Sequence, residues 1–389
     1  MTKNKIKSGV FSVGALDPDR KLFDEIIPLP KGTSYNSYLV QGSNKIALID
    51  TVDTTKTDTL IANLNGVKKI DYIVANHAEQ DHSGSIPAIL KIHPKAQVIC
   101  TEKCKGMLID MLEINEDKFI IVNDEDTISL GDKTLKFLTT PWVHWPETMT
   151  TYLVEDKILF PCDFLGAHVA SNKFVKDEKS TYDLAKLYFA GIMMPFRIPI
   201  RKNLEKIKTL EIDIIAPSHG EIHGNPNFII EAYEDWASDN TKKQVLIPYI
   251  SMHGSTKILV EHVAKSLQKK GIIVNVFNLT ESNIGELATS LVDSSGIIFA
   301  SPAFLAGAHP GVANAAYLIN ILRPKTKFVS LLGSFEWGEN MANQIFDMLK
   351  LVKAERIPPL IIKGVPKKQD NNKIDEFVKI IAEKCIGGK

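Results

Sequence analysis

Short apolar runs alternate with polar, glycine-containing stretches along the whole chain. The pattern is clearest in the last third. There the apolar run Val245–Ile250 leads into a Gly/Ser loop, a helix-length segment at about 257–270 and a second apolar run, Ile272–Phe277. Regular alternation of strand and helix is typical of a parallel sheet with helices on both faces. We therefore predict an α/β protein whose second part is a doubly wound parallel sheet.

The chain is long enough for two domains, because 389 residues can bury two full-sized cores. Short strand-like and helix-like segments also alternate over the first part of the chain. The polar break Asn240–Gln244 separates them from the later pattern. We predict a first domain over residues 1–242 and a second over residues 243–389.

Composition narrows the class of protein. The 46 basic and 46 acidic residues cancel, so no global field favours nucleic acid as a partner. Four scattered cysteines suit a reducing cytoplasm, and the basic N-terminus leads into no apolar segment typical of a signal peptide. The uncharged stretch Ser294–Leu322 contains Pro302 and Pro310, so we interpret it as a buried strand, a loop and a helix, not a membrane span.

Four apolar, strand-like runs of the first part each end in a residue that can bind metal. These residues are His77, His144, Asp163 and His219. Strands of one sheet have their ends on one rim, so the four side chains can converge on one point. Three of the runs carry a proline shortly before the candidate ligand, which indicates that the strand stops where the loop begins.

The first of these ends is a dense cluster, His77-Ala-Glu79-Gln-Asp81-His82. Alternate residues of an extended segment face the same side, so His77, Glu79 and Asp81 can line one cavity. Taken alone, such a cluster also fits a polar surface loop. Together with the three later strand-end residues it predicts a metal site.

This set of motifs resembles the metal signature of the metallo-β-lactamase superfamily. Glu79 stands where the zinc hydrolases of that superfamily usually have a second histidine, and that exchange distinguishes the flavodiiron proteins, or A-type flavoproteins. Three further segments are similar to flavodiiron sequences: Ser34–Leu39, Asp81–Ser85 and Trp142–Glu147. The resemblance covers essentially the whole chain. It implies a metallo-β-lactamase-like αββα sandwich followed by a flavodoxin-like domain.

The resemblance also implies the metal ligands. The implied set is His77, Glu79 and His144 on one iron, Asp81 and His219 on the other, and Asp163 bridging the two. Three imidazoles and three carboxylates make a harder, more anionic site than a histidine-rich zinc centre, which suits iron. His82 binds metal in many hydrolase relatives but is often turned away in flavodiiron proteins, so its role stays open.

Neighbouring polar residues receive structural or supporting roles. Asp50 is interpreted as fixing the loop beneath the metals. His168, five residues after Asp163, is either a proton donor behind the ligands or a structural residue. The family often has a tyrosine facing the metals in this region of the chain, and the position that matches it here is Phe189, with Tyr188 beside it.

Three loops of the second part indicate a flavin site. The first follows the strand Val245–Ile250 and begins a helix, where small residues and hydroxyls can cradle an anion. The other two end the third and fourth strands, at the rim where flavodoxin-like sheets bind FMN. The resemblance implies that the loops hold the phosphate and flank the ring of FMN. Ala303 replaces the usual threonine and Glu336 a common glycine. The predicted FMN-binding residues are Ser251, Met252, His253, Gly254, Ser255, Thr256, Ser301, Pro302, Ala303, Phe304, Leu305, Ser334, Phe335, Glu336, Trp337 and Gly338.

The resulting functional prediction is an oxidoreductase with two irons and FMN that reduces O₂ to water with four electrons. An external donor, reduced rubredoxin or a reduced deazaflavin cofactor, supplies the electrons. Reduction of NO to N₂O is the near alternative. A dizinc hydrolase and a non-catalytic O₂ or NO sensor are the alternatives from other classes. We expect a head-to-tail homodimer or a dimer of such dimers, with no membrane or nucleic-acid partner.

Overall fold

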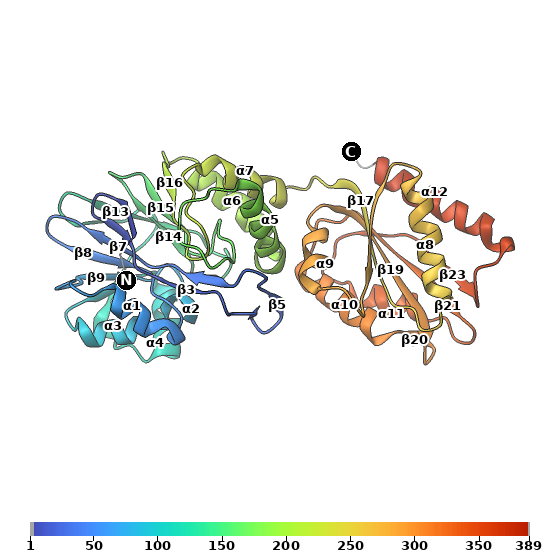
Figure 1. Ribbon diagram of the computed structural model, residues 1–389, viewed down its shortest axis with the longest axis horizontal. Helices are drawn as coiled ribbons and strands as arrows, with labels where there is room; N and C mark the ends of the chain where they lie inside the picture. Colours follow the sequence, from blue (N-terminus) through green and yellow to red (C-terminus); the bar gives the residue numbers. More distant parts are fainter. Residues whose placement is uncertain (1–3, 388–389) are drawn as a thin grey trace. The chain divides into compact units, whose positions relative to one another are not determined.

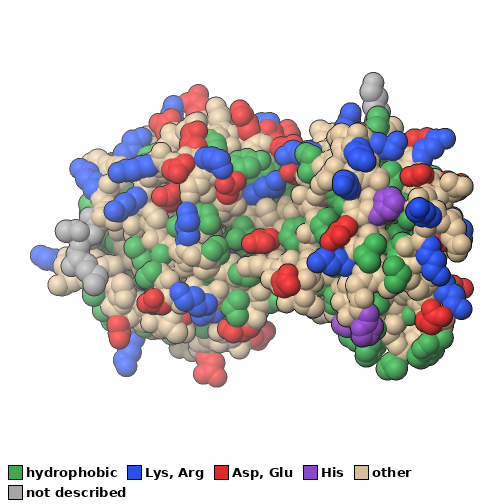
Figure 2. Space-filling view, turned by 45° about the vertical axis from the view of Figure 1, so that its right-hand side comes forward, with side chains coloured by type: hydrophobic (Ala, Val, Ile, Leu, Met, Phe, Trp, Pro, Cys, Tyr) green, Lys and Arg blue, Asp and Glu red, His purple; other side chains and the backbone are tan. Residues whose placement is uncertain are grey.

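The structure, a computed structural model, describes residues 4–387. These residues divide into two compact units, residues 4–189 with 196–237 and residues 190–195 with 238–387. Each unit has sheets and helices of its own (Figure 1). On the face drawn in Figure 2, acidic, basic and apolar side chains are interspersed over both units.

The first unit contains two sheets. The seven-stranded sheet has the order β1-β2-β7-β8-β9-β10-β11, and the five-stranded sheet has the order β12-β13-β14-β15-β16. The strands of the larger sheet are β1 (Asn4–Lys7), β2 (Val10–Ser12), β7 (Tyr38–Gln41), β8 (Ile46–Ile49), β9 (Tyr72–Val74), β10 (Gln97–Cys100) and β11 (Phe119–Ile121). Those of the smaller sheet are β12 (Thr127–Ser129), β13 (Thr134–Thr139), β14 (Met149–Leu153), β15 (Ile158–Phe160) and β16 (Ile214–Ile215). Two hairpins stand apart: β3 (Ala15–Asp17) with β6 (Thr33–Tyr35), and β4 (Leu22–Phe23) with β5 (Ile27–Pro28).

Side-chain alternation along the strands explains the layers of this unit. On β7, Tyr38 and Val40 face the smaller sheet and Leu39 faces the helices on the other side. Two apolar cores result, one between the sheets and one under α1, α3 and α4. Helices α5, α6 and α7 lie beside the smaller sheet (Figure 1), which completes the predicted αββα order. The helices are α1 (Thr57–Asn63), α2 (Gln80–Ser83), α3 (Ile86–Ile92), α4 (Glu102–Leu112), α5 (Glu178–Tyr188), α6 (Arg197–Ile207) and α7 (Pro226–Ala237).

The second unit is the predicted doubly wound parallel sheet. Its strand order is β18-β17-β19-β21-β22, β23 also pairs with β21 in parallel, and the short β20 pairs with β19. Helices α8 and α12 cover one face, and α9, α10 and α11 cover the other (Figure 1). The strands are β17 (Lys242–Tyr249), β18 (Ile273–Asn278), β19 (Ser294–Phe304), β20 (Gly307–Ala308), β21 (Phe328–Phe335), β22 (Glu355–Arg356) and β23 (Leu360–Lys363). The helices are α8 (Ser255–Gln268), α9 (Ile284–Leu291), α10 (Pro310–Leu322), α11 (Met341–Met348) and α12 (Asn371–Ile386).

The uncharged stretch 294–322 forms β19, β20 and α10, which confirms its interpretation as a strand, a loop and a helix. Within residues 4–387, no helix combines the length and the apolar character that crossing a membrane requires.

Candidate metal centre and flavin pocket

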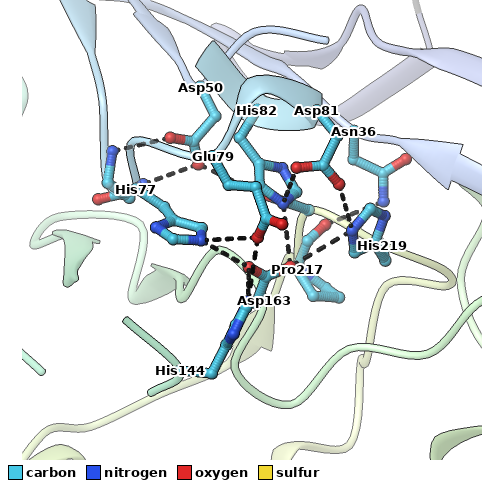
Figure 3. A network of polar contacts seen from close by, with 12 residues as sticks. Asn36, Asp50, His77, Glu79, Asp81, His82, His144, Asp163, Pro217 and His219 are labelled. Atoms are coloured by element: carbon cyan, nitrogen blue, oxygen red, sulfur yellow. Dashed lines mark hydrogen bonds and ion pairs between the residues drawn. The ribbon is translucent and has the colours of Figure 1, made fainter. Parts of the chain in front are cut away.

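All six predicted metal ligands lie together at one rim of the first unit (Figure 3). His77 and Glu79 follow β9, Asp81 lies on the single turn of α2, and the other three side chains follow strands of the smaller sheet. These are His144 after β13, Asp163 after β15 and His219 after β16. The four strand-end residues converge, as the sequence predicted. The expectation that their strands belong to one sheet was wrong, because β9 lies in the larger sheet and β13, β15 and β16 lie in the smaller one.

Four of these side chains form a first group. The Glu79 Oε2 atom lies 3.1 Å from His77 Nε2 and 3.1 Å from His144 Nε2. The Asp163 Oδ2 atom lies 3.5 Å from His77 Nε2 and 3.4 Å from His144 Nε2. Two imidazole nitrogens and two carboxylate oxygens thus face a common point.

A second group lies next to the first and includes His82. His219 Nε2 lies 3.1 Å from Asp81 Oδ2, and His82 Nε2 lies 3.3 Å from Asp81 Oδ1. The Asp163 Oδ1 atom is 3.3 Å from His219 Nε2 and 3.0 Å from His82 Nε2. The role of His82 was open from the sequence, and the structure turns its ring toward the second group.

Asp163 contributes to both groups, with one carboxylate oxygen facing each. The buried atoms Asp163 Oδ2, His219 Nε2 and both carboxylate oxygens of Asp81 lie at ion-pair distance from neighbours but make no hydrogen bond. A buried polar atom without a partner costs about 1–3 kcal/mol, so this arrangement is stable only if something else satisfies these atoms. Two cations, one in each group, fit that requirement.

The pKa values of the ligands reflect the same arrangement. Burial lowers the pKa of His77, but hydrogen bonds to Glu147 and Glu79 outweigh burial and raise the pKa to about 10. Burial likewise lowers the pKa of His144, and Asp163 and Glu79 raise it to about 10. Burial raises the pKa of Glu79, yet the two imidazoles hold it below its usual range. The carboxylates thus favour a positive charge on these imidazoles, and a metal ion competes with protons for the same nitrogen atoms.

Sequence reasoning missed Glu147, which is buried behind the first group. Its Oε1 atom accepts hydrogen bonds from His77 Nδ1 at 2.6 Å and from the backbone N of Ala78 at 3.0 Å. His219 Nδ1 donates in the same way to the carbonyl oxygen of Ser34, at 2.6 Å. Such acceptors fix the tautomer and the orientation of a metal-binding imidazole. Glu147 belongs to the segment Trp142–Glu147, which resembles flavodiiron sequences. The sequence alone does not show that the carboxylate of Glu147 contacts His77.

Asp50 supports the loop that carries the ligands, as interpreted from the sequence. Its carboxylate accepts hydrogen bonds from the backbone N of Asn76 at 2.8 Å and from Asn76 Nδ2 at 2.9 Å. Ser218 Oγ donates to the same carboxylate at 3.2 Å. Asp50 therefore ties together the two loops that present His77 and His219.

Of the neighbours Phe189 and Tyr188, between which the sequence left the role of the tyrosine open, Tyr188 is the one that contacts a predicted ligand. The hydroxyl of Tyr188 donates a hydrogen bond to Asp163 Oδ1 at 3.0 Å, whereas the Phe189 ring packs on Tyr233 and Trp236. Consecutive side chains at the end of a helix point in different directions, so only one of the two can face the ligands. Burial raises the pKa of Tyr188 well above its usual value, so the hydroxyl keeps its proton.

His168 lies beside the second group without joining it. Its ring stands 4.6 Å from the His219 ring and 4.8 Å from the Tyr188 ring, and Nδ1 is 2.9 Å from Thr33 Oγ1. The Nε2 atom is buried without a hydrogen-bond partner. Burial lowers the pKa of His168 well below its usual value, so the ring is neutral.

Removing the negative charge of the acceptor behind His77 should weaken metal binding, because a neutral amide oxygen is a weaker partner for the imidazole. We expect Glu147→Gln to lower the metal affinity of the first group by about 10- to 100-fold, since orienting acceptors of metal-binding histidines have effects of that size. Competition with a chelator measures this affinity. Asp156→Asn is the control, because Asp156 is a buried carboxylate that pairs with Lys133 instead. Equal affinities in wild type and Glu147→Gln would contradict the role of Glu147.

The second unit contains a pocket of about 280 Å³ where three loops meet. The pocket lies at the carboxyl ends of β17, β19 and β21, as predicted, although Pro302 and Ala303 still belong to β19 and Ser334 and Phe335 to β21. The pocket is lined by Ser251, Met252, His253, Ser255, Thr256, Pro302, Ala303, Ser334, Phe335, Glu336, Trp337 and Gly364. Gly364 was not predicted. The predicted residues that do not line the pocket are Gly254, Ser301, Phe304, Leu305 and Gly338.

The loop between β17 and α8 forms a candidate anion site at the start of α8. Gly254 precedes the helix with φ +93°, a conformation that residues with a side chain rarely adopt. The first N–H groups of a helix lack acceptors within the helix. Ser251 Oγ accepts from the backbone N of Gly254 at 3.1 Å and of Lys257 at 3.2 Å, and Thr256 Oγ1 lies 2.8 Å from Ser334 Oγ. Hydroxyls and N–H groups gathered at a helix start fit a phosphate group.

Comparison with known proteins extends over both units. A family model described as ODP family beta lactamase matches residues 33–220. The chain is similar to a nitric oxide reductase of Moorella thermoacetica, with 33% identity over an alignment of 389 positions that covers 97% of each chain. It is 32% identical over 365 residues to the flavo-diiron protein FprA2 of Clostridium acetobutylicum, which covers 90% of this chain and 91% of the relative. Among solved structures, the rubredoxin oxygen:oxidoreductase of Desulfovibrio gigas superimposes with a TM-score of 0.95 at 26% identity and covers 99% of both chains.

Proposed function

This chain belongs to the flavodiiron protein family, and from that premise we propose that it reduces O₂ to water with four electrons from an external donor. It is an oxidoreductase of a family that works with iron and flavin. The finer assignments are our proposal: two irons in the first domain, residues 1–242, and FMN in the second, residues 243–389.

The observation that carries the proposal is the shared carboxylate of Asp163. Its two oxygens face two groups of ligands, and each group adds imidazole nitrogens and a further carboxylate. We assign His77, Glu79 and His144 to one iron, Asp81 and His219 to the other, and Asp163 to both. His82 is a further candidate for the second iron, because its Nε2 atom faces that group. The mixed nitrogen and oxygen donors suit iron.

When bound, the two irons would supply redox-active Lewis acids and FMN would supply stored electrons. The protein's own groups hold and orient these cofactors. Glu147 and the Ser34 carbonyl orient the imidazoles of His77 and His219. Tyr188 keeps its proton and donates it in a hydrogen bond to Asp163, so a neutral O–H group stands beside the shared carboxylate.

Reduction of NO to N₂O is the second candidate, favoured by the similarity to the nitric oxide reductase of Moorella thermoacetica. The donor is external in either case, and we propose reduced rubredoxin or a reduced deazaflavin cofactor. The dizinc hydrolase is less well supported, because Glu79 replaces a histidine and the second unit carries a pocket suited to FMN.

We also propose that the working unit is a head-to-tail homodimer, or a dimer of such dimers. Apolar side chains are exposed beside each site. Trp142 is 50% exposed and stacks on Phe196, whose ring lies 6.4 Å from that of His144. Met252 and Trp337 line the flavin pocket and are 43% and 66% exposed. The metal centre and the flavin must exchange electrons. Exposed apolar side chains beside both sites support an interface in which the metal centre of one subunit faces the flavin of the other across a two-fold axis.

Metal analysis and the visible spectrum of the purified protein test the proposal, together with O₂ and NO consumption with a chemically reduced donor. The proposal requires about two irons per chain, flavin absorption bands and O₂ consumption. Faster consumption of NO than of O₂ would favour the second candidate. Zinc without flavin would overturn both candidates.

A negative charge in the first flavin loop should release FMN and leave the metals in place. Ser251→Asp puts a carboxylate where we place the phosphate. The two negative charges repel each other in a partly buried site, so we expect FMN affinity to fall by about 100-fold or more. Fluorescence titration measures FMN binding, and elemental analysis measures the iron. Ser282→Asp is the matched control, because it adds the same charge just before another helix, α9. Loss of iron along with FMN would show that the two sites are not independent.

A further inference from the structure

The loop after β21 brings a formal charge into the flavin pocket. Glu336 is the one acidic residue among the pocket-lining residues, and no lysine or arginine is among them. Its neighbours in the loop, Phe335 and Trp337, line the same pocket. Any flavin bound there therefore lies close to a carboxylate.

Among the described residues, one basic side chain pairs with this carboxylate, and it comes from β23. Lys363, the last residue of β23, has its Nζ atom 3.7 Å from Glu336 Oε1. The backbone N of Gly364 donates to the Phe335 carbonyl at 2.8 Å, so the end of β23 is tied to the loop. A Cβ atom built at Gly364 would lie 3.6 Å from Glu336 Oε2, so the backbone of Gly364 lies next to this carboxylate.

A fixed charge at this place changes how readily a flavin accepts electrons. Reduction adds negative charge to the ring system, so a nearby carboxylate disfavours it and a nearby ammonium favours it. The side chains of Glu336 and Lys363 are 73% and 65% exposed, so water and salt screen both effects. The sign of each effect is nonetheless fixed by the sign of its charge.

We infer that the Glu336–Lys363 pair sets the reduction potential of the flavin bound in this pocket, with Glu336 lowering the potential and Lys363 raising it. The pair thereby determines which donors are reducing enough to deliver electrons. This inference rests on the proposed function, because it requires FMN in the pocket. It concerns the tuning of the flavin and leaves the identity of the substrate aside.

Redox titration of the FMN-loaded, full-length protein tests the inference. The flavin absorbance reports the midpoint potential of wild type, Glu336→Gln, Lys363→Met and Glu376→Gln. Glu376 is an exposed acid on α12, outside the pocket, and serves as the matched control. We expect a higher potential in Glu336→Gln, a lower one in Lys363→Met and no change in the control.

Ionic strength separates a charge effect from a structural one. The difference between wild type and Glu336→Gln should shrink as salt is added, because salt screens exposed charges and does not undo a change in packing. Equal potentials in wild type and Glu336→Gln, shifts of the same sign in both variants, or loss of flavin from Glu336→Gln alone would overturn the inference. Wild-type protein that binds no flavin would instead overturn the proposed function, and this inference with it.

Discussion

Replacing Asp163 with alanine should empty both metal positions at once and abolish O₂ reduction. The Asp163 Oδ2 atom faces His77 and His144, and its Oδ1 atom faces His82 and His219. Among the described residues, Asp163 is the one whose carboxylate forms ion pairs with imidazoles of both groups. We expect activity to fall by about three orders of magnitude or more, since metal-ion catalysis stabilises a transition state by several kcal/mol.

Elemental analysis of the purified variant checks this expectation, with flavin content measured on the same sample. His144→Ala is the informative companion, because His144 contacts the first group alone. It should lose metal from the first position and keep part of the second. If Asp163→Ala retained one tightly bound iron, Asp163 would belong to one group and the proposed bridge would be wrong.

The convergence of the metal ligands was predictable because it depends on local pattern. Each of His77, His144, Asp163 and His219 follows an apolar strand. The last three follow strands of the smaller sheet, whose ends share a rim, whereas His77 follows β9 of the larger sheet, so the packing of the two sheets brings it to the same place. The doubly wound sheet of the second unit followed from the alternation of strands and helices in the same way. Such features need only the period of the side chains and the order of the elements.

Features that depend on orientation in space were not predictable. Whether His82 faces the ligands depends on the direction of the single turn of α2, which the spacing of the motif leaves free. The choice between Tyr188 and Phe189 depends on how the end of α5 is rotated, and the two positions differ by one residue. Glu147 lies 70 residues from its partner His77, so only the folded chain shows their contact.

In the flavin pocket, too, the position of the site was predictable and the individual contacts were not. The three loops were predictable from the ends of β17, β19 and β21, because the strand order reverses direction beside β17. Individual contacts within the loops were not. Ser301 is buried and accepts a hydrogen bond from the backbone N of His309, so it supports the loop from behind. Gly364 reaches the pocket from β23, a strand that no motif connected with flavin.

Two inactive variants should restore activity to each other if electrons pass between subunits. The first carries His77→Ala and His144→Ala and lacks metal in the first group. The second carries Ser251→Asp and lacks FMN. In a head-to-tail homodimer, the FMN of one subunit serves the metal centre of its partner, so each heterodimer contains one complete pair of sites and one pair that lacks both cofactors.

Random exchange of equal amounts makes half of the dimers heterodimers, and each has one working pair out of two, so we expect about a quarter of wild-type activity. Each variant alone should stay inactive, as should the mixture before exchange. Different affinity tags on the two variants allow the heterodimers to be isolated and their O₂ consumption measured directly. Heterodimers without activity would mean that electrons pass within one chain, because a chain that lacks either cofactor could then never complete the reaction. Recovery requires the FMN of one subunit to serve the metals of the other, and no arrangement confined to a single chain produces it.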